Sequence, residues 1–170
     1  LITETVSDFT VFTRDASDVN IDTANVSGHA ITFGSLAATS VVSSGGTYPA
    51  GDSSQNYIIQ FTTDNPIPID GNVRVTWDAD YDISGAGYVA YPTSSVAGNV
   101  ASASGAVLIV NLDEGTAVGE AVVVSIYISG ITNPDTTGTT DNYVVETEDT
   151  AANSYADIDT GTAPGNTVTL

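Results

Sequence analysis

Apolar and polar residues alternate with a period of two along much of the chain, and this pattern predicts β-strands. The clearest case lies within residues 56–82. Two sets of apolar positions there would face the core: Tyr57, Ile59 and Phe61 in a first strand, and Val73, Val75 and Trp77 in a second. The connection at residues 64–71 contains Pro66 and Pro68, which cannot donate to a central ladder, and it ends in an Asp-Gly turn signal. We therefore expect two core strands of a β-sandwich that are joined outside its sheets.

Shorter runs of the same kind predict strands at residues 9–13, 29–33, 37–43, 87–91, 106–112, 120–129, 142–147 and 166–170. In one of the strongest, at 120–129, we expect a core face made of Val122, Val124, Ile126 and Ile128. Polar or small residues predict loops between the runs, among them 15–25 and 92–105. No long stretch has helical periodicity. The pattern is typical of an all-β fold, an antiparallel β-sandwich of the Ig-like or jelly-roll type.

The same pattern divides the chain into two parts. Residues 1–34 would form an extended N-terminal arm with the first strands, and residues 35–170 would form the sandwich domain. In the arm, alternation places Phe9 and Val11 on one face of a strand and Phe12 on the other. Apolar residues on both faces favour a strand that is covered on both sides or is lent to a neighbouring molecule.

The charge balance excludes several classes of partner. The chain has 21 Asp and Glu residues against two basic residues, Arg14 and Arg74, and its formal net charge is −19. Such a charge repels a phosphate backbone and an anionic lipid surface, so we expect no nucleic-acid partner and no charge-driven membrane binding. No apolar run approaches the roughly 20 residues that a membrane-spanning helix needs.

The composition favours a protein outside the cell. Only 14% of the residues are charged and 41% are hydrophobic, so Thr, Ser, Asn and Gly must cover most of the surface. A Thr-rich, acidic surface suits β-structure and glycosylation, and we expect an extracellular or cell-surface location. The triplet Asn25-Val26-Ser27 fits the N-glycosylation sequon, which makes Asn25 a candidate site, although chance explains such a triplet equally well.

Three segments carry a resemblance to a known family: FTTDNPIPIDGNVRVTW at residues 61–77, VSIYISGITNPDTTGTTDNYVVETED at 124–149, and DIDTGTAPGNTVT at 157–169. Together they resemble a β-sandwich module that is repeated in large microbial cell-surface and S-layer-like proteins. The resemblance covers roughly residues 35–170, and the arm falls outside it. It implies a sandwich fold and a structural role, and it rests on no catalytic residue.

A sandwich with a strand-forming arm also resembles the subunits of extracellular filaments that polymerise by donor-strand complementation. In such filaments the arm of one subunit completes the sheet of the next through main-chain hydrogen bonds, and a contact that does not close produces a fibre. The resemblance implies that Phe9, Val11 and Phe12 anchor the arm in the adjacent subunit. We therefore expect a structural subunit of a microbial filament or surface assembly, whose partners are copies of itself.

The chain is poorly equipped for catalysis. It has no Cys and no Lys, its one imidazole is that of His29, and no Gly-x-Ser-x-Gly motif is present. Zinc and iron sites would lack their usual soft ligands. We expect no enzyme and no required cofactor.

Acidic residues offer one candidate metal site. Asp78, Asp80 and Asp82 alternate, so they would lie on one side if the strand before them continued past Trp77. Ca²⁺ would suit three such carboxylates because it takes several hard oxygen ligands and tolerates irregular geometry, although the spacing is not that of an EF-hand. The alternative is a solvated acidic strand end. Similar acidic edges occur at Glu146, Glu148 and Asp149, and at Asp157 and Asp159.

Two other functions stay open. Tyr81, Tyr88 and Tyr91 could form a platform for stacking on sugar rings, which would suit an adhesin or carbohydrate-binding module of a larger surface protein. The alternative is that Tyr88 and Tyr91 pack under the rim of the sandwich. A glycoside hydrolase fragment would need two carboxyl groups that face each other across a cleft, about 5 to 10 Å apart.

Overall fold

The computed structural model describes residues 4–5, 9–14, 16–18, 20–26, 30–31, 33–90, 94–112, 117–151 and 154–170. The chain forms two compact units, Leu1–Phe33 and Gly34–Leu170. We call the first the arm and the second the sandwich. The sequence pattern placed the boundary between them one residue later.

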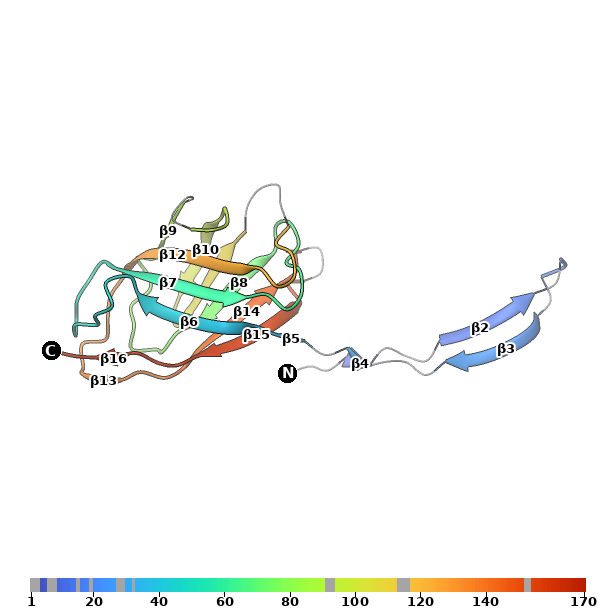
Figure 1. Ribbon diagram of the computed structural model, residues 1–170, viewed down its shortest axis with the longest axis horizontal. Coiled ribbons are helices and arrows are strands. Elements are labelled where there is room, and N and C mark those ends of the chain that lie inside the picture. The colour runs from blue at the N-terminus through green and yellow to red at the C-terminus, as the bar shows by residue number, and fades with distance from the viewer. Residues whose placement is uncertain are drawn as a thin grey trace. The chain divides into compact units, whose positions relative to one another are not determined.

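Two packed sheets build the sandwich (Figure 1). Among the described residues, the larger sheet has six strands in the order β10 (Asn99–Ser104), β11 (Val107–Asn111), β8 (Asn72–Thr76), β14 (Tyr143–Glu148), β15 (Asp157–Ala163) and β5 (Gly34–Ser35). The smaller sheet has four described strands in the order β6 (Ala37–Ser43), β7 (Gln55–Thr62), β12 (Val123–Ile131) and β9 (Gly87–Val89). β5 runs parallel to β15, and the other pairs are antiparallel. The short strands β13 (Gly138–Thr139) and β16 (Thr167–Val168) form a further pair.

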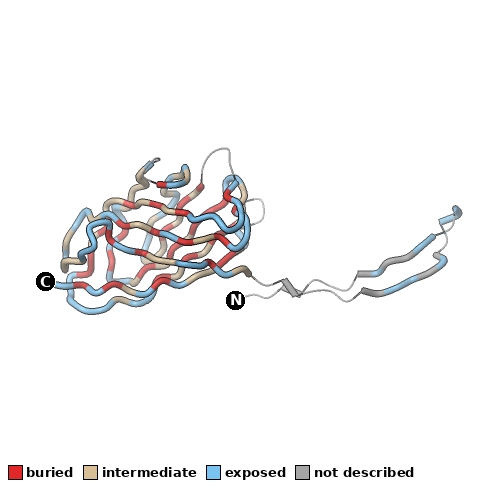
Figure 2. Tube along the Cα trace, in the orientation of Figure 1, coloured by how far each residue is buried: buried red, intermediate tan, exposed pale blue. Residues whose placement is uncertain are grey.

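The inner faces of the two sheets meet in one hydrophobic core, and buried positions alternate with more exposed ones along the strands (Figure 2). The apolar faces that the alternation predicted are buried in it: Tyr57, Ile59, Phe61, Val73, Val75, Trp77, Val124, Ile126 and Ile128. Burying one such large side chain contributes about 1.5–3 kcal/mol, so these positions dominate the stability of the sandwich. The all-β antiparallel sandwich is confirmed.

The connection between β7 and β8 carries the chain from one sheet to the other. Asp159 of β15 holds the start of this connection: its side chain is fully buried, and its carboxylate accepts hydrogen bonds from the backbone N–H of Asp64 (3.1 Å) and Asn65 (2.9 Å) and from Asn65 Nδ2 (2.7 Å). At the other end, a Cβ on Gly71 would lie 2.8 Å from the carbonyl oxygen of Glu148, so glycine is required there. Asp159 is therefore a structural carboxylate and not part of an acidic surface edge.

The structure corrects four details of the sequence-based prediction. Residues 15–25, expected as a loop, contain most of β3 (Asn20–Val26), and residues 92–105 contain β10. β15 was not predicted, because its sequence DIDTGTA has no apolar alternation. Val122 is 40% exposed, since the backbone turns at Ala121 (φ 55°) and the strand begins only at Val123.

Candidate functional site

The arm is a β-hairpin. Its two longer strands, β2 (Phe9–Arg14) and β3, pair antiparallel, and the shorter β1 (Glu4–Thr5) pairs with β4 (Ala30–Ile31). All three predicted anchor residues lie in β2, where Phe9 is opposite Val26, Val11 is opposite Ala24 and Phe12 is opposite Thr23. The strand expected at residues 9–13 is thus present, and its own chain already pairs with one of its edges.

The hairpin buries none of its described side chains. Every residue between 9 and 26 whose exposure is described is exposed, including the apolar Ile21, which is 64% exposed. At the turn, Arg14 Nη1 lies 2.7 Å from Asp18 Oδ1, but both side chains are exposed, so this ion pair contributes little stability. The side chains of the hairpin whose exposure is described therefore contribute no buried core.

A hairpin of this kind is suited to pairing with another molecule. An isolated two-stranded hairpin is at best marginally stable in water. Among the described residues β2 and β3 form a sheet of two strands, so each presents one edge that no other described strand covers. Open strand edges are templates for pairing with another chain. We therefore treat the β2–β3 hairpin as the candidate assembly site.

The candidate glycosylation site belongs to the same hairpin. Asn25 lies in β3 with its backbone opposite Thr10, and not in the loop that the sequence predicted. Ser27, the third residue of the sequon, lies outside the described residues. Glycosylation of Asn25 stays a prediction.

The structure does not bring the candidate calcium ligands together. β8 ends before them, so the condition for placing Asp78, Asp80 and Asp82 on one side of a strand is not met. The carboxylate of Asp78 accepts hydrogen bonds from the backbone N–H of Asp80 (2.9 Å) and Asp141 (2.7 Å), and that of Asp82 accepts from the N–H of Ser84 (2.9 Å). Hydrogen bonding from Ser84 holds the pKa of Asp82 below its usual value. Among the described residues, no three His, Cys, Asp or Glu side chains form a group that could hold a metal ion.

The predicted sugar platform is not formed as expected. Tyr81 is 3% exposed and cannot stack on a ligand. Tyr88 is half-buried, its hydroxyl donates to the carbonyl oxygen of Val96, and burial raises its pKa. Tyr91 lies outside the described residues. Tyr88 packs against the core, as the alternative expects for that ring, and the burial of Tyr81 was not predicted.

Tyr81 is part of an aromatic cluster in the core. Its ring lies near those of Tyr57, Trp77 and Tyr143, with centroids 5.9, 5.3 and 6.1 Å away. The hydroxyl of Tyr143 donates to that of Tyr81 (2.9 Å) and accepts a hydrogen bond from Asn166 Nδ2 (2.7 Å). Burial raises the pKa of Tyr57 and of Tyr143 well above the usual range, so both hydroxyls stay protonated. These rings stabilise the fold.

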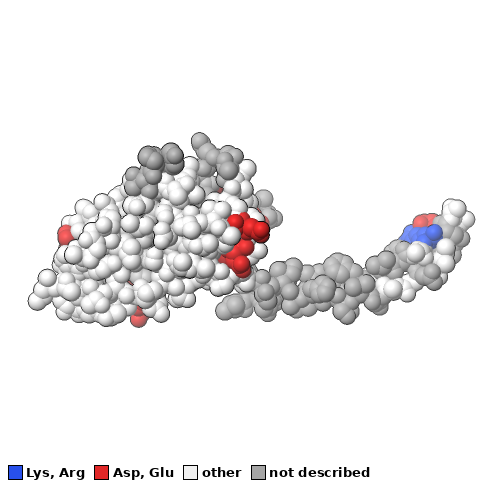
Figure 3. All heavy atoms as spheres, viewed as in Figure 1, with Lys and Arg blue, Asp and Glu red and all other residues white. Residues whose placement is uncertain are grey.

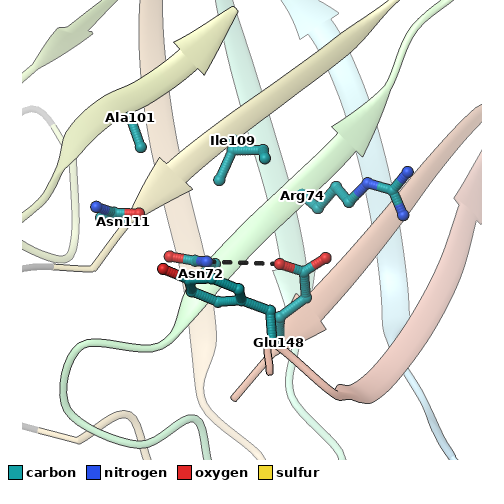
Figure 4. Close-up of a pocket in the computed structure, with 7 residues that line it drawn as sticks. Asn72, Arg74, Ala101, Ile109, Asn111 and Glu148 are labelled. Carbon is teal, nitrogen blue, oxygen red and sulfur yellow. Dashed lines mark hydrogen bonds between the residues drawn. The ribbon is translucent and has the colours of Figure 1, made fainter. Parts of the chain in front are cut away.

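A pocket of about 300 Å³ lies on the outer face of the six-stranded sheet (Figure 4). Two cross-strand rows meet there: Asn111, Asn72 and Glu148 in one, and Ile109, Arg74 and Glu146 in the other. Ala101 of β10 and Tyr155, from the loop between β14 and β15, complete the wall. The pocket thus contains one of the two basic residues of the chain.

The polar groups of this pocket are only partly satisfied. Arg74 Nη1 pairs with Glu146 Oε2 at 3.1 Å. Asn72 Nδ2 faces Glu148 Oε2 at 3.5 Å, and Asn72 Oδ1 is buried without a hydrogen-bond partner. Burial raises the pKa of Glu148, whose side chain is 6% exposed. The buried carboxylate of Glu148 is therefore destabilising when it is charged.

Replacing Glu148 with Gln is expected to stabilise the protein at neutral pH. Because the folded state holds the proton of Glu148 more tightly than the unfolded state, the wild type loses stability as the pH rises from the unfolded pKa through the folded one. Glu148→Gln removes that loss. Thermal unfolding should show a higher midpoint for the variant at pH 7, and the difference should shrink below pH 4. Asp135→Asn, at an exposed position, is the matched control and should show no such pattern. An equal gain at both pH values would contradict the assignment.

Sequence reasoning missed this pocket. The available signal was the alternation of Glu146 and Glu148, which puts both on the same side if the strand predicted at residues 142–147 continues by one residue, as β14 does. Their partners Arg74 and Asn72 lie far away along the chain, and only strand pairing brings them together.

His29, the only imidazole, lies outside the described residues, and the part of the chain that is described contains no helix long and apolar enough to cross a membrane. Comparison with models of protein families and with curated proteins finds no match to this chain.

Proposed function

We propose that this protein is a non-enzymatic structural subunit that assembles with copies of itself into an extracellular filament or surface layer, using its arm as the connecting element. The observation that carries the proposal is the β2–β3 hairpin, which no further described strand joins and which buries none of its described side chains. Pairing with a second copy would give this hairpin the third strand that an isolated pair needs for stability.

The distribution of charge supports contact between copies. Molecules with a net charge of −19 repel one another, so contacts between them are favoured where charge is absent. None of the residues in β6, β7, β9 and β12 is charged. Figure 3 views the sandwich from the side of β6, β7 and β12 and shows a broad surface almost without charged side chains. An uncharged sheet face of this kind lets acidic subunits approach closely.

Electron microscopy of the purified chain, with sedimentation on the same sample, tests the proposal. We expect regular fibres or sheets with a constant repeat, because a head-to-tail contact that does not close propagates. A sample that stays monomeric over a wide range of protein and salt concentration would contradict the proposal.

A carbohydrate-binding module is the second candidate, and the pocket beside Asn72 favours it. The pocket combines an unpartnered amide oxygen with an Arg, a Glu and a half-exposed Tyr ring, and this set could bind the hydroxyl groups and the face of a sugar. It would predict a monomer that binds glycans through Tyr155 and Asn72. The monomeric outcome of the assembly test would make it the leading candidate.

A further inference from the structure

One edge of the six-stranded sheet is formed by a six-residue strand, which contacts β9 of the other sheet. β10 is the last strand of the six-stranded sheet, and among the described residues no strand pairs with its outer side. Its residues from Ala101 to Ser104 are exposed or half-buried. A β-bulge at Ala101 shifts the register of β10 against β11 and interrupts this edge.

The edge where β15 and β6 meet is closed by the chain itself. Leu36 N donates to Thr160 O (2.9 Å), and a Cβ on Gly161 would lie 2.8 Å from Cβ of Leu36, so the start of β6 sits against β15. The carbonyl of Val41 in β6 accepts a hydrogen bond from Asn166 Nδ2 (3.2 Å). These contacts occupy part of the outer side of β6 and of β15.

The edge at β9 is short and partly covered. β9 has three residues, and short edge strands are poor templates for pairing. Beyond the end of β9, Ser95 N donates to Ser125 O (2.8 Å) and Tyr127 N donates to Ser94 Oγ (2.9 Å). The loop that contains Ser94 and Ser95 therefore already provides hydrogen-bond partners for the backbone of β12. We therefore consider β10 the best candidate for a receiving edge in the part of the sandwich that is described.

The β10 edge also lacks the charges that normally prevent edge-to-edge pairing. Natural edge strands often carry Lys or other charged residues. Here the whole segment from Ile83 to Leu112 contains no charged residue, although the chain as a whole has a net charge of −19. Repulsion between copies is therefore weakest where the backbone of β10 is available.

The core is incompletely covered beside this edge. Tyr88, Val96, Val100 and Ala103 are partly buried and pack against the core cluster. A strand added next to β10 would cover such half-exposed apolar side chains if its own inward face were apolar. Both main-chain pairing and apolar burial would then stabilise the addition.

We infer that β10 is the acceptor edge for the arm of a second copy, whose β2 strand pairs with it and extends the six-stranded sheet. This inference rests on the proposed function and names the surface that receives the arm. β2 and β10 each have six residues, and β2 carries no charge from Phe9 to Thr13, whereas β3 contains Asp22. The hairpin adds as a preformed pair, so β2 can keep its bonds to β3 while its other edge joins β10.

Cysteine cross-linking tests the inference, since the chain has no cysteine of its own. Full-length Thr10→Cys chains are mixed with Ser102→Cys chains, allowed to assemble, and treated with a short bis-maleimide. Ser53→Cys, at an exposed site in the loop between β6 and β7, replaces Ser102→Cys in the matched control. The dimer between Thr10→Cys and Ser102→Cys is expected to exceed the control by about tenfold or more, because thiols held at a contact have a millimolar effective concentration.

The outcomes separate the inference from the proposed function. If fibres form but the cross-link between Thr10→Cys and Ser102→Cys is no more abundant than that of the Ser53→Cys control, β10 is not the acceptor edge. The proposal that the arm connects the subunits would still stand. A dominant product between two Ser102→Cys chains would overturn it as well, because β10 would then pair with its own copy. If the full-length chain without substitutions does not assemble at all, both the proposed function and the inference are contradicted.

Discussion

Deleting residues 1–33 is expected to abolish fibre formation while leaving the sandwich folded. The core cluster lies entirely within residues 36–163, so the deletion removes no core side chain. Assembly depends on the arm in the proposed function, and the truncated chain should remain monomeric by sedimentation and show no fibres by electron microscopy. Thermal unfolding of the truncated chain is measured alongside, because a cooperative transition shows that the sandwich has folded.

A substitution in the full-length chain makes the same test without truncation. Val11 lies in the middle of β2, opposite Ala24, and Val11→Pro removes a backbone donor and disrupts the strand. Losing two or three main-chain hydrogen bonds, each worth about 0.5–1.5 kcal/mol, should lower the association constant about tenfold or more. Val11→Ile keeps a β-branched residue and should assemble normally. Fibres of normal yield from Val11→Pro would show that the arm does not connect the subunits.

Replacing Trp77 with Ala is expected to lower the free energy of unfolding by about 3–5 kcal/mol, the largest effect among the substitutions proposed for this protein. Trp77 is 3% exposed, and its ring lies 5.1 Å from that of Tyr57 and 5.2 Å from that of Tyr143, in edge-to-face geometry with both. The substitution leaves a cavity and removes these aromatic contacts. Equilibrium denaturation in urea measures the effect.

Two comparisons make the Trp77 test specific. Val123→Ala, at a strand position that is 57% exposed, should change the free energy of unfolding by no more than about 0.5 kcal/mol. Trp77→Phe should cost less than Trp77→Ala, because it keeps an aromatic ring and also removes a buried indole N–H that has no hydrogen-bond partner. If Trp77→Ala lowered the free energy of unfolding by less than about 1 kcal/mol, the aromatic cluster would not be a main source of the stability of the sandwich.

Local patterns succeeded where a strand has one face in the core. In β7 the alternation of Tyr57, Ile59 and Phe61 with polar neighbours predicted both the strand and its buried face. The same reasoning failed for β10, whose sequence NVASAS has only small side chains and one valine. An edge strand buries little on either face, so it needs no apolar alternation, and its sequence resembles that of a loop.

The surroundings of the candidate site residues depend on contacts between distant parts of the chain, which the local alternation of apolar and polar residues does not reveal. Tyr81 looked like a surface residue within an acidic stretch, yet its ring packs against Trp77 and its hydroxyl bonds to Tyr143. Asp159 looked like part of an acidic edge, yet it is fully buried and holds the backbone of Asp64 and Asn65. The hydrogen-bond partners, Tyr143 for Tyr81 and Asp64 and Asn65 for Asp159, lie far away along the chain, so the local sequence gives no sign of them.

The sequence by itself determined the all-β class, the core faces of the strongest strands, a strand at residues 9–13 and the excess of negative charge. These follow from local alternation and composition, because a period of two assigns each residue to one face of a strand. Only the tertiary structure decided which strands are neighbours, which edge stays open and which polar groups share a pocket. Asn72 and Glu148 face each other across two paired strands. Their meeting depends on the order of the strands in the sheet, which is set by how the two sheets pack and not by the residues around either one.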